Sequence, residues 1–475
     1  MNGSITRLFG LVIVLFGVLV AFTSRWTVFE AEALRDNEVN RRPVLEEERI
    51  RRGTIRSQEG RVLARSVPLR GERYGRRYPT DALAAHAIGY AFTDIGRAGL
   101  ERFRNDELTG RRTELVSIID SLLGPSNTGD DVRTTIDARA QAVAVKALDG
   151  RKGAVVALDV KTGAVRVMTS IPSYDPNGLD DRQRFRALQT DDQNSPLLNR
   201  ATQAGYPPGS TFKVVTAAAA LDSGRYQPGS RVNGRNGKVI SGVPLNNFGS
   251  ESFGDIDLTT ALTNSVNTVW AEVAVKLGRS TMSEYMRRFG FETKPPLDYP
   301  DDQMIASGVR GPRGRLIPSN SRRVDLGRLA IGQERLLVTP LQMATVAQTV
   351  ANGGMRVEPH LTARVTDPDG RTVDRIGTEE VEQVISPKTA RQLTLMMRNV
   401  VREGTGTAAA LEGITVAGKT GTAEIDIPRR INQPWFIGFA GRVAVAVTLE
   451  RVQGGTGGVD AAPVAKQVLE ALGQR

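Results

Sequence analysis

One uncharged segment near the N-terminus constrains this 475-residue chain more than any other feature. Residues 8–24 (LFGLVIVLFGVLVAFTS) contain no charged side chain and lie between Arg7 and Arg25. A membrane-spanning helix needs about 20 mainly apolar residues, with about 17 as the lower limit, and flanking residues such as Trp26 can reach the interfaces. We therefore expect residues 1–25 to form a short cytoplasmic tail and a transmembrane anchor.

A cleaved signal peptide is the competing interpretation of this segment, because the apolar run is short and close to the N-terminus. Ala21-Phe22-Thr23 is a poor cleavage site, however, since such sites carry small residues at both outer positions. No second run of this kind follows, so everything after Arg25 is expected on one side of the membrane. The short tail favours a single-pass protein whose large remaining part is extracytoplasmic.

The chain contains no cysteine and only two histidines, His86 and His360. It therefore has no thiol nucleophile, no disulfide framework and no cysteine-based metal site, and we expect neither a metal nor a cofactor. A Ser-His-Asp triad would have to use one of those two histidines. If the chain is a serine hydrolase or acyltransferase, its base is expected to be another residue.

The formal net charge is +11, but only ten of the 63 basic residues are lysines, and the first is Lys146. A strong basic balance is typical of proteins that bind nucleic acid or an anionic membrane surface. No basic helix or aromatic-rich strand motif accompanies it, so we predict no nucleic acid binding.

Residues 52–64 are predicted to form a strand, a turn at Glu59-Gly60 and a second strand. This hairpin is either simply solvated or a basic surface facing lipid.

A turn-rich segment at 124–133 marks the expected domain boundary. It separates a small mixed N-terminal domain, residues 26–133, from a larger domain, residues 134–475. In the first domain, Gly99-Leu-Glu101-Arg102 is expected to open a helix. In the second, Asp137 is a candidate N-cap for a helix through residue 148.

Strands are predicted at both ends of the larger domain, with helical patterns between them. They fall at 153–158, 164–168, 435–439 and 443–447, and a closing helix is expected at 461–472. Lys161-Thr-Gly163 would form the turn between the first two strands. The pattern predicts an α+β domain whose sheet joins both ends of the segment.

Ser210 and Lys213 form the first candidate for catalysis, because Lys213 is the only lysine with a serine three positions before it. Pro207-Pro208-Gly209 interrupts the preceding chain, and Ser210 is expected at the start of an apolar helix that runs to Leu221. A spacing of three places both side chains on one helix face, where a neutral lysine can take the proton of the serine. The alternative is structural, with Ser210 as an N-cap and Lys213 as a solvated helix residue.

Two further short motifs strengthen the catalytic interpretation. Ser265-Val-Asn267 could present a second hydroxyl and an amide to the same cleft, and Lys419-Thr420-Gly421-Thr422 would form a strand edge with a cation and two hydroxyls. Lys161-Thr-Gly163 matches the same tripeptide, but it precedes the serine and lies between two strands. We interpret that copy as a structural turn.

The order Ser-x-x-Lys, Ser-x-Asn, Lys-Thr-Gly resembles that of penicillin-binding proteins and serine β-lactamases. The chain is similar to class B (monofunctional) penicillin-binding proteins over nearly its whole length, and its arginine-rich, compact form resembles actinobacterial members. That resemblance implies a membrane anchor, a non-catalytic pedestal or interaction domain, and a transpeptidase domain with a central antiparallel sheet flanked by helices. The supporting motifs are Arg52-Gly53, Gly99-Leu-Glu101, Ser173-Tyr-Asp-Pro-Asn177, Ile331-Gly-Gln333, Ala351-Asn-Gly-Gly354 and Trp435-Phe-Ile-Gly438.

The resemblance also implies a reaction, the D,D-transpeptidation of peptidoglycan stem peptides ending in D-Ala-D-Ala, with β-lactams as inhibitors. Ser210 would attack the penultimate carbonyl, D-alanine would leave, and an amine of a neighbouring stem would take the acyl group. Lys213 would be the base, Ser265 would pass a proton to the leaving amine, and Asn267 would bind a substrate amide.

The Lys-Thr-Gly motif is expected to bind the substrate. Lys419, Thr420 and Thr422 suit the terminal carboxylate, and Gly421 belongs to the same binding strand. Backbone N–H groups of Ser210 and Thr422 would stabilise the oxyanion. Lys419 and partial burial are also the expected means of keeping Lys213 neutral near pH 7.

Two other functions remain open at this stage. A D,D-carboxypeptidase or β-lactamase would use the same motifs but transfer the acyl group to water. A non-catalytic division scaffold or β-lactam sensor would need only the binding surfaces. Cell-division or elongation proteins are the expected partners of the N-terminal domain.

Overall fold

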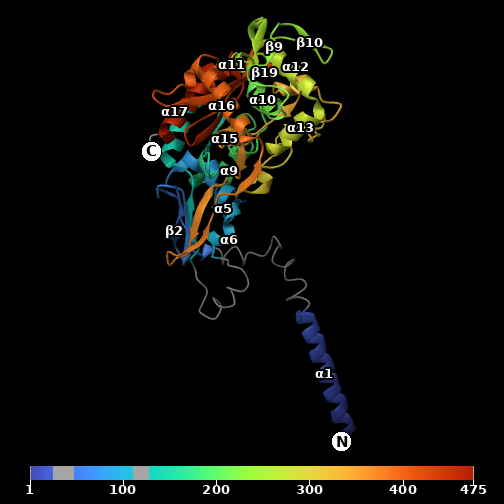
Figure 1. Ribbon diagram of the computed structural model, residues 1–475. Helices are drawn as coiled ribbons and strands as arrows, with labels where there is room; N and C mark the ends of the chain where they lie inside the picture. The colour runs from blue at the N-terminus through green and yellow to red at the C-terminus, as the bar shows by residue number, and fades with distance from the viewer. Residues whose placement is uncertain (1, 25–47, 111–127, 474–475) are drawn as a thin grey trace.

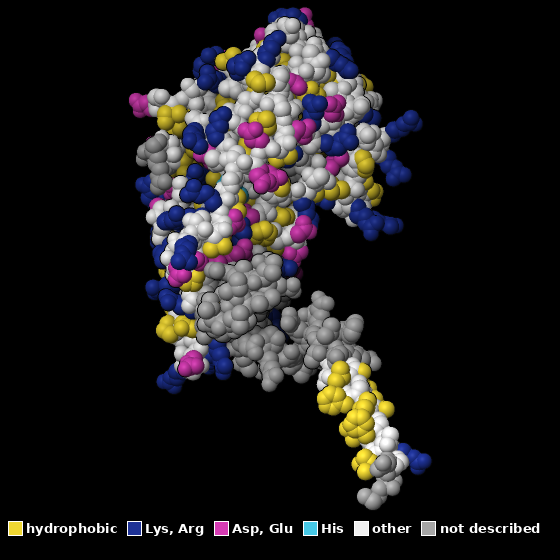
Figure 2. All heavy atoms as spheres, turned by 60° about the horizontal axis from the view of Figure 1, so that its bottom comes forward, with side chains coloured by type: hydrophobic (Ala, Val, Ile, Leu, Met, Phe, Trp, Pro, Cys, Tyr) yellow, Lys and Arg dark blue, Asp and Glu magenta, His cyan; other side chains and the backbone are white. Residues whose placement is uncertain are grey.

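The computed structural model describes residues 2–24, 48–110 and 128–473 of the chain. The predicted flank at Arg25 and Trp26 and the first part of the predicted boundary loop, 124–127, lie outside the described residues. Helix α1 (Asn2–Ser24) contains a stretch long and apolar enough to cross a membrane. Its large hydrophobic side chains are exposed, and Figure 2 shows hydrophobic groups along it, whereas the body of the molecule carries mixed charges. The helix fits a single membrane anchor.

The N-terminal domain is built on a six-stranded sheet in the order β17-β16-β6-β1-β2-β3. The predicted strand, turn and strand at 52–64 are confirmed as β1 and β2, with Gly60 N donating to Ser57 O at 3.0 Å in the turn. Two strands come from far along the chain, and β16 pairs antiparallel with β6. The strands are β1 (Ile55–Arg56), β2 (Val62–Leu69), β3 (Arg73–Arg77), β6 (Asp131–Thr134), β16 (Thr362–Thr366) and β17 (Thr372–Arg375).

The larger domain contains an antiparallel sheet in the order β19-β20-β21-β7-β8, which confirms that one sheet joins both ends of the segment. Strand β22 (Val452–Gln453) pairs with β20 beside this path. Strand β19 lies at the edge of the sheet, as expected for the Lys-Thr-Gly strand. The strands are β7 (Gly153–Asp159), β8 (Val165–Ile171), β19 (Val416–Asp426), β20 (Ile431–Ala440) and β21 (Val443–Leu449).

Helices cover both faces of this sheet, so alternate residues of its strands enter different parts of the core (Figure 1). The predicted N-cap is confirmed, because the Asp137 carboxylate accepts from Arg139 N and Ala140 N at the start of α8. Val155 packs with the α8 and α17 side, whereas Val156 packs with the α10 and α15 side. These helices are α8 (Ala138–Leu148), α10 (Lys213–Asp222), α15 (Pro340–Ala351), α16 (Pro387–Arg402) and α17 (Ala462–Gly473).

Shorter helices and strands complete both parts of the structure. The predicted helix start at 99–102 is confirmed as α5. The hairpin β10-β11 and a second antiparallel pair, β12-β9, lie in the insertion between α10 and α11. The remaining helices are α4 (Ala85–Ile88), α5 (Gly99–Phe103), α6 (Asn105–Leu108), α9 (Arg182–Gln189), α11 (Leu258–Thr263), α12 (Asn267–Leu277), α13 (Arg279–Arg288) and α14 (Leu326–Ala330). The remaining strands are β4 (Ala91–Phe92), β5 (Gly96–Arg97), β9 (Arg231–Asn233), β10 (Lys238–Ile240), β11 (Val243–Leu245), β12 (Asp255–Asp257), β13 (Gly308–Val309), β14 (Leu336–Leu337), β15 (Met355–Val357) and β18 (Glu380–Gln383).

Candidate active site

Ser210 lies in a single 3₁₀ turn, η4 (Gly209–Phe212), immediately before α10. Sequence reasoning expected an α-helix from Ser210 onward, and the tighter turn improves the alignment. A 3₁₀ helix has three residues per turn, so side chains at i and i+3 eclipse each other. The Ser210 Oγ and the Lys213 Nζ accordingly lie 2.9 Å apart.

Lys213 is fully buried, and its amine lies among four oxygen atoms. Besides Ser210 Oγ, the Nζ donates to Asn267 Oδ1 at 2.6 Å, to Ser265 O at 2.7 Å and to Ser265 Oγ at 3.2 Å. A neutral amine has two hydrogens and one lone pair. Two of these oxygens can therefore accept its hydrogens while the lone pair faces a hydroxyl that gives up a proton.

The pKa of Lys213 lies well below its ordinary value, first because burial penalises the ammonium and second because Lys419 repels it. Lys419 is also fully buried, and burial lowers its pKa to about 7. Its Nζ donates to Thr420 O at 3.1 Å. The expected depression of the Lys213 pKa therefore has both of the causes proposed from sequence. Lys419 itself, however, holds its charge only up to neutral pH.

Ser265 and Asn267 lie at the junction of α11 and α12, where the chain turns beside Lys213. Ser265 has a φ of 58°, a left-handed conformation that is uncommon for a residue other than glycine. Asn267 begins α12, and its Nδ2 donates to Asn246 O at 3.0 Å. Because Oδ1 accepts from Lys213, both ends of this amide are fixed by the protein.

Strand β19 forms the opposite wall of the site, and alternate residues of the strand point to opposite faces. Thr420 and Thr422 line the cleft. The Thr420 Oγ1 lies 2.5 Å from the Thr405 Oγ1, and the Thr422 Oγ1 accepts from Gly457 N at 3.1 Å. Each threonine hydroxyl is thus held in place by a neighbouring segment, that of Thr420 by the loop at Thr405 and that of Thr422 by the helical turn that begins at Gly457.

Gly421 has a packing role beyond the binding role expected from the motif. A Cβ added at this residue would lie 2.6 Å from Pro208 O and 3.0 Å from Thr211 Cγ2, so only glycine lets β19 lie against the turn that carries Ser210. Gly421 is buried and is absent from the residues that line the cleft.

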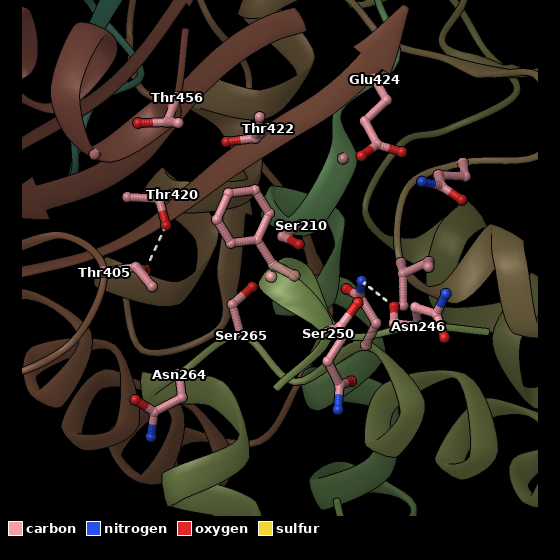
Figure 3. Close-up of a pocket in the computed structure, with 18 of the residues that line it drawn as sticks. Ser210, Asn246, Ser250, Asn264, Ser265, Thr405, Thr420, Thr422, Glu424 and Thr456 are labelled. Carbon is pink, nitrogen blue, oxygen red and sulfur yellow. Dashed lines mark hydrogen bonds between the residues drawn. The ribbon is translucent and has the colours of Figure 1, made fainter. Parts of the chain in front are cut away.

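Five of the candidate residues open onto one cleft of about 1040 Å³. Figure 3 shows Ser210 and Ser265 facing Thr420, Thr422 and Glu424 across it. Lys213 and Lys419 lie buried behind its surface. Its lining includes Ser210, Ser265, Asn267, Thr420 and Thr422, together with Asn246, Asn247, Phe248, Ser250, Asn264, Arg328, Gln333, Thr405, Glu424, Thr456 and Val459.

Sequence reasoning missed Asn246 and Thr405. Each lies in a loop, contacts a motif residue and belongs to no periodic pattern.

The other Lys-Thr-Gly copy, at residues 161–163, is a structural turn as expected. Lys161 lies between β7 and β8, and its Nζ donates to Asn352 Oδ1 at 2.9 Å. Among the described residues, no group of three or more histidine, aspartate or glutamate side chains could hold a metal ion.

Both histidines lie away from the residues that line the cleft. His86 is buried, its Nε2 lies 2.8 Å from Pro196 O, and burial lowers its pKa to about 4. The backbone of His360 bridges to Ala164 at the start of β8. Within the part of the chain that the structure describes, the side-chain amines next to the cleft are those of Lys213 and Lys419.

Comparisons with known proteins give two matches along this chain. The penicillin binding protein transpeptidase domain matches residues 153–470, and the penicillin binding protein A dimerisation domain matches residues 52–132. The peptidoglycan D,D-transpeptidases PbpA of Mycolicibacterium smegmatis and Mycobacterium tuberculosis are 35% and 33% identical to it, each over 99% of both chains.

Solved structures resemble the fold equally well. The ceftriaxone acyl-enzyme complex of penicillin-binding protein A from M. tuberculosis superposes with a TM-score of 0.81 at 32% identity, over 90% of this chain and 99% of that one. The D,D-transpeptidase domain of an Eggerthella lenta peptidoglycan glycosyltransferase gives a TM-score of 0.78 at 32% identity, over 89% of this chain and 98% of that one.

Proposed function

Because the chain belongs to the penicillin-binding protein transpeptidase family, we propose that it forms peptidoglycan cross-links through an acyl-enzyme on Ser210. Its function is peptidoglycan D,D-transpeptidation in cell wall synthesis, and it binds β-lactams. The observation that most supports the proposed mechanism is the position of Lys213 Nζ, 2.9 Å from the Ser210 hydroxyl and held by Ser265 and Asn267.

The first step is acylation by a stem peptide ending in D-Ala-D-Ala. Neutral Lys213 accepts the proton of Ser210 while the Ser210 Oγ bonds to the penultimate carbonyl carbon. When the tetrahedral intermediate collapses, the C–N bond to the terminal D-alanine breaks. Ser265, whose hydroxyl lies 3.2 Å from Lys213 Nζ, passes that proton to the leaving amine.

The second step transfers the acyl group to an amine of a neighbouring stem. The amine attacks the ester carbonyl, and its proton returns through the same groups to the Ser210 oxygen as that oxygen leaves. A new amide is formed, and the free enzyme is regenerated. Water at this step would instead give hydrolysis, which is the activity of a D,D-carboxypeptidase.

We assign substrate binding to residues on the two walls of the cleft. Thr420, Thr422 and the ammonium form of Lys419 suit the terminal carboxylate, and the second N–H of the Asn267 amide suits a substrate carbonyl. The backbone N–H groups of Ser210 and Thr422 are the proposed oxyanion donors. Gly421 contributes by holding the two walls together.

The wider organisation follows from this assignment. We assign residues 1–25 to the tail and anchor, 26–133 to the N-terminal interaction domain and 134–475 to the transpeptidase domain. Stem peptides of the cell wall lie outside the cytoplasmic membrane, so the catalytic domain is placed there, held by α1. Cell-division or elongation proteins are the proposed partners of the N-terminal domain.

The test uses the full chain in detergent and the Ser210→Ala variant. Covalent labelling by a fluorescent penicillin should disappear in the variant, while circular dichroism stays that of the wild type. Ser223→Ala, which removes a serine at the other end of α10, should label normally. Persistent labelling of Ser210→Ala would refute the nucleophile assignment. With a D-Ala thioester donor, product that depends on an added D-amino acid supports transfer, whereas hydrolysis alone contradicts it.

A further inference from the structure

Among the described residues, two charged side chains line the cleft, those of Arg328 and Glu424. Only one of these charges is neutralised by a partner. The Arg328 guanidinium forms an ion pair with Asp325 at 3.0 Å and donates to Pro244 O at 3.1 Å. The Glu424 carboxylate is exposed, and within the described residues it forms neither an ion pair nor a hydrogen bond. The cleft therefore presents one unpaired anionic group to whatever enters it.

Glu424 lies on the same face of β19 as Thr420 and Thr422, because residues two apart along a strand point the same way. Figure 3 shows its side chain reaching from the strand into the cleft that contains Ser210. Four residues of strand span about 13 Å, so Glu424 lies roughly that far along β19 from Thr420. Thr420 and Glu424 thus lie at opposite ends of the part of the strand that lines the cleft.

The two ends of this wall differ in charge. At one end, Lys419 and the two threonine hydroxyls suit a carboxylate, and at the other end Glu424 suits a cation. A peptide laid along β19 with its C-terminus at Thr420 would have its preceding residues near Glu424. The substrate in the proposed reaction brings amines to this cleft, since transpeptidation needs an amino group as acceptor.

We propose that Glu424 is a specificity-determining residue that binds a side-chain alkylammonium group of a stem peptide. This inference rests on the proposed function. The ammonium belongs either to the donor peptide, just before its D-Ala-D-Ala end, or to the incoming acceptor. In both cases the carboxylate selects a cationic side chain over a neutral one and aligns the peptide along β19.

The donor arm of the test compares two peptides, Nα-acetyl-Lys-D-Ala-D-Ala and its Nε-acetylated form. The full chain is the enzyme, and kcat/KM is measured from the D-alanine that each peptide releases. The wild type should prefer the charged donor by about fivefold, the size expected for an exposed ion pair. In Glu424→Gln the ratio should fall to about one, and in Glu424→Lys it should invert. The preference should also shrink in 0.5 M NaCl, because salt screens exposed charges.

The acceptor arm loads the enzyme from a thioester donor without charged side chains and offers D-lysine or Nε-acetyl-D-lysine. The measured quantity is the ratio of transfer to hydrolysis for each acceptor. If the ammonium belongs to the acceptor, the wild type favours D-lysine here and Glu424→Gln loses that preference. Glu412→Gln, which removes an exposed glutamate outside the cleft lining, should behave as wild type in both arms.

A preference in either arm that depends on Glu424 supports the inference and identifies the source of the ammonium. A wild-type ratio near one in both arms overturns it, and so does a preference that survives Glu424→Gln. Failure of the proposed function is seen separately, because the Nε-acetylated donor would then release no D-alanine and penicillin would not label Ser210.

Discussion

At the scale of single residues, the charge of Lys419 is coupled to the protonation of Lys213. The pKa of Lys419 is about 7 because of burial, and the Lys213 pKa is lowered first by burial and then by the charge of Lys419. The sequence analysis took Lys419 as a cation. In the free enzyme at neutral pH it is only partly charged, and a bound carboxylate would favour its charged form.

This coupling predicts how acylation depends on pH. The ammonium form of Lys419 is present below its pKa and is lost as pH rises through about 7, so binding of a substrate carboxylate should weaken above neutrality. We expect the second-order rate constant for acylation by benzylpenicillin to fall at least tenfold between pH 7 and 9. The methyl ester of the same penicillin, which lacks the carboxylate, serves as the control in stopped-flow measurements. A parallel decline for both compounds would contradict the assignment of Lys419.

The sequence could identify Ser210, Lys213, Ser265 and Asn267 as candidate site residues. Ser210 and Lys213 are three positions apart, Ser265 and Asn267 are two apart, and local backbone geometry fixes such pairs. It could not identify Thr405, which touches Thr420 from a loop 15 positions away in the chain. That contact depends on tertiary packing, and hydroxyl pairs leave no periodic pattern. Glu424 follows the Lys-Thr-Gly motif by three positions in the sequence, but its lack of a partner has no sequence signal.

At the scale of elements, the site depends on the contact between the turn η4 and the edge strand β19. The strand was predicted from the apolar residues before Lys419, and a helix start was predicted at Ser210 from the proline pair and the apolar run, although the structure has a 3₁₀ turn there. Their contact was not predictable, because it depends on the close approach of Gly421 to the Pro208 carbonyl.

Gly421→Ala tests that contact. The added methyl would lie 2.6 Å from Pro208 O, so the turn and the strand must move apart, and overpacking of this kind costs about 1–3 kcal/mol. We expect a lower melting temperature and a penicillin acylation rate reduced by about tenfold or more, measured on the detergent-solubilised chain. Gly229→Ala, where no atom lies within 4 Å of the new Cβ, should change neither quantity. An unchanged acylation rate in Gly421→Ala would mean that this approach does not position Ser210.

At the scale of the whole molecule, the two parts of the chain share a sheet. Strand β16 comes from within the segment predicted as catalytic, yet it pairs with β6 and carries β17 at the edge of the N-terminal sheet. The turn-rich residues at 124–133 indicated a boundary in the sequence, but pairing between strands over 200 residues apart has no local signal. The Arg104 side chain adds a hydrogen bond to Thr362 Oγ1 at 3.2 Å.

A buried ion cluster in the N-terminal domain gives this arrangement a measurable consequence. Glu101 is fully buried, and its carboxylate accepts from Arg76 at 2.6 Å, from Arg52 at 3.1 Å and from the Tyr78 hydroxyl at 3.3 Å. Burial alone would raise the pKa of Glu101, but the two arginine charges outweigh it and the pKa lies below its ordinary value. The cluster thereby joins α5 to β3 and to the chain just before β1.

Glu101→Gln should therefore destabilise the N-terminal domain by about 3 kcal/mol, because it leaves two buried guanidinium groups without their carboxylate. A carboxyl whose pKa is depressed by folding stabilises the protein above its unfolded pKa and loses that effect as pH falls. The difference in melting temperature between wild type and variant should accordingly be largest at pH 7 and become smaller toward pH 3. Penicillin labelling at 25 °C should persist, since Ser210 lies in the other domain, and the exposed Glu72→Gln serves as control. Equal melting temperatures at pH 7 would show that the cluster contributes nothing to stability.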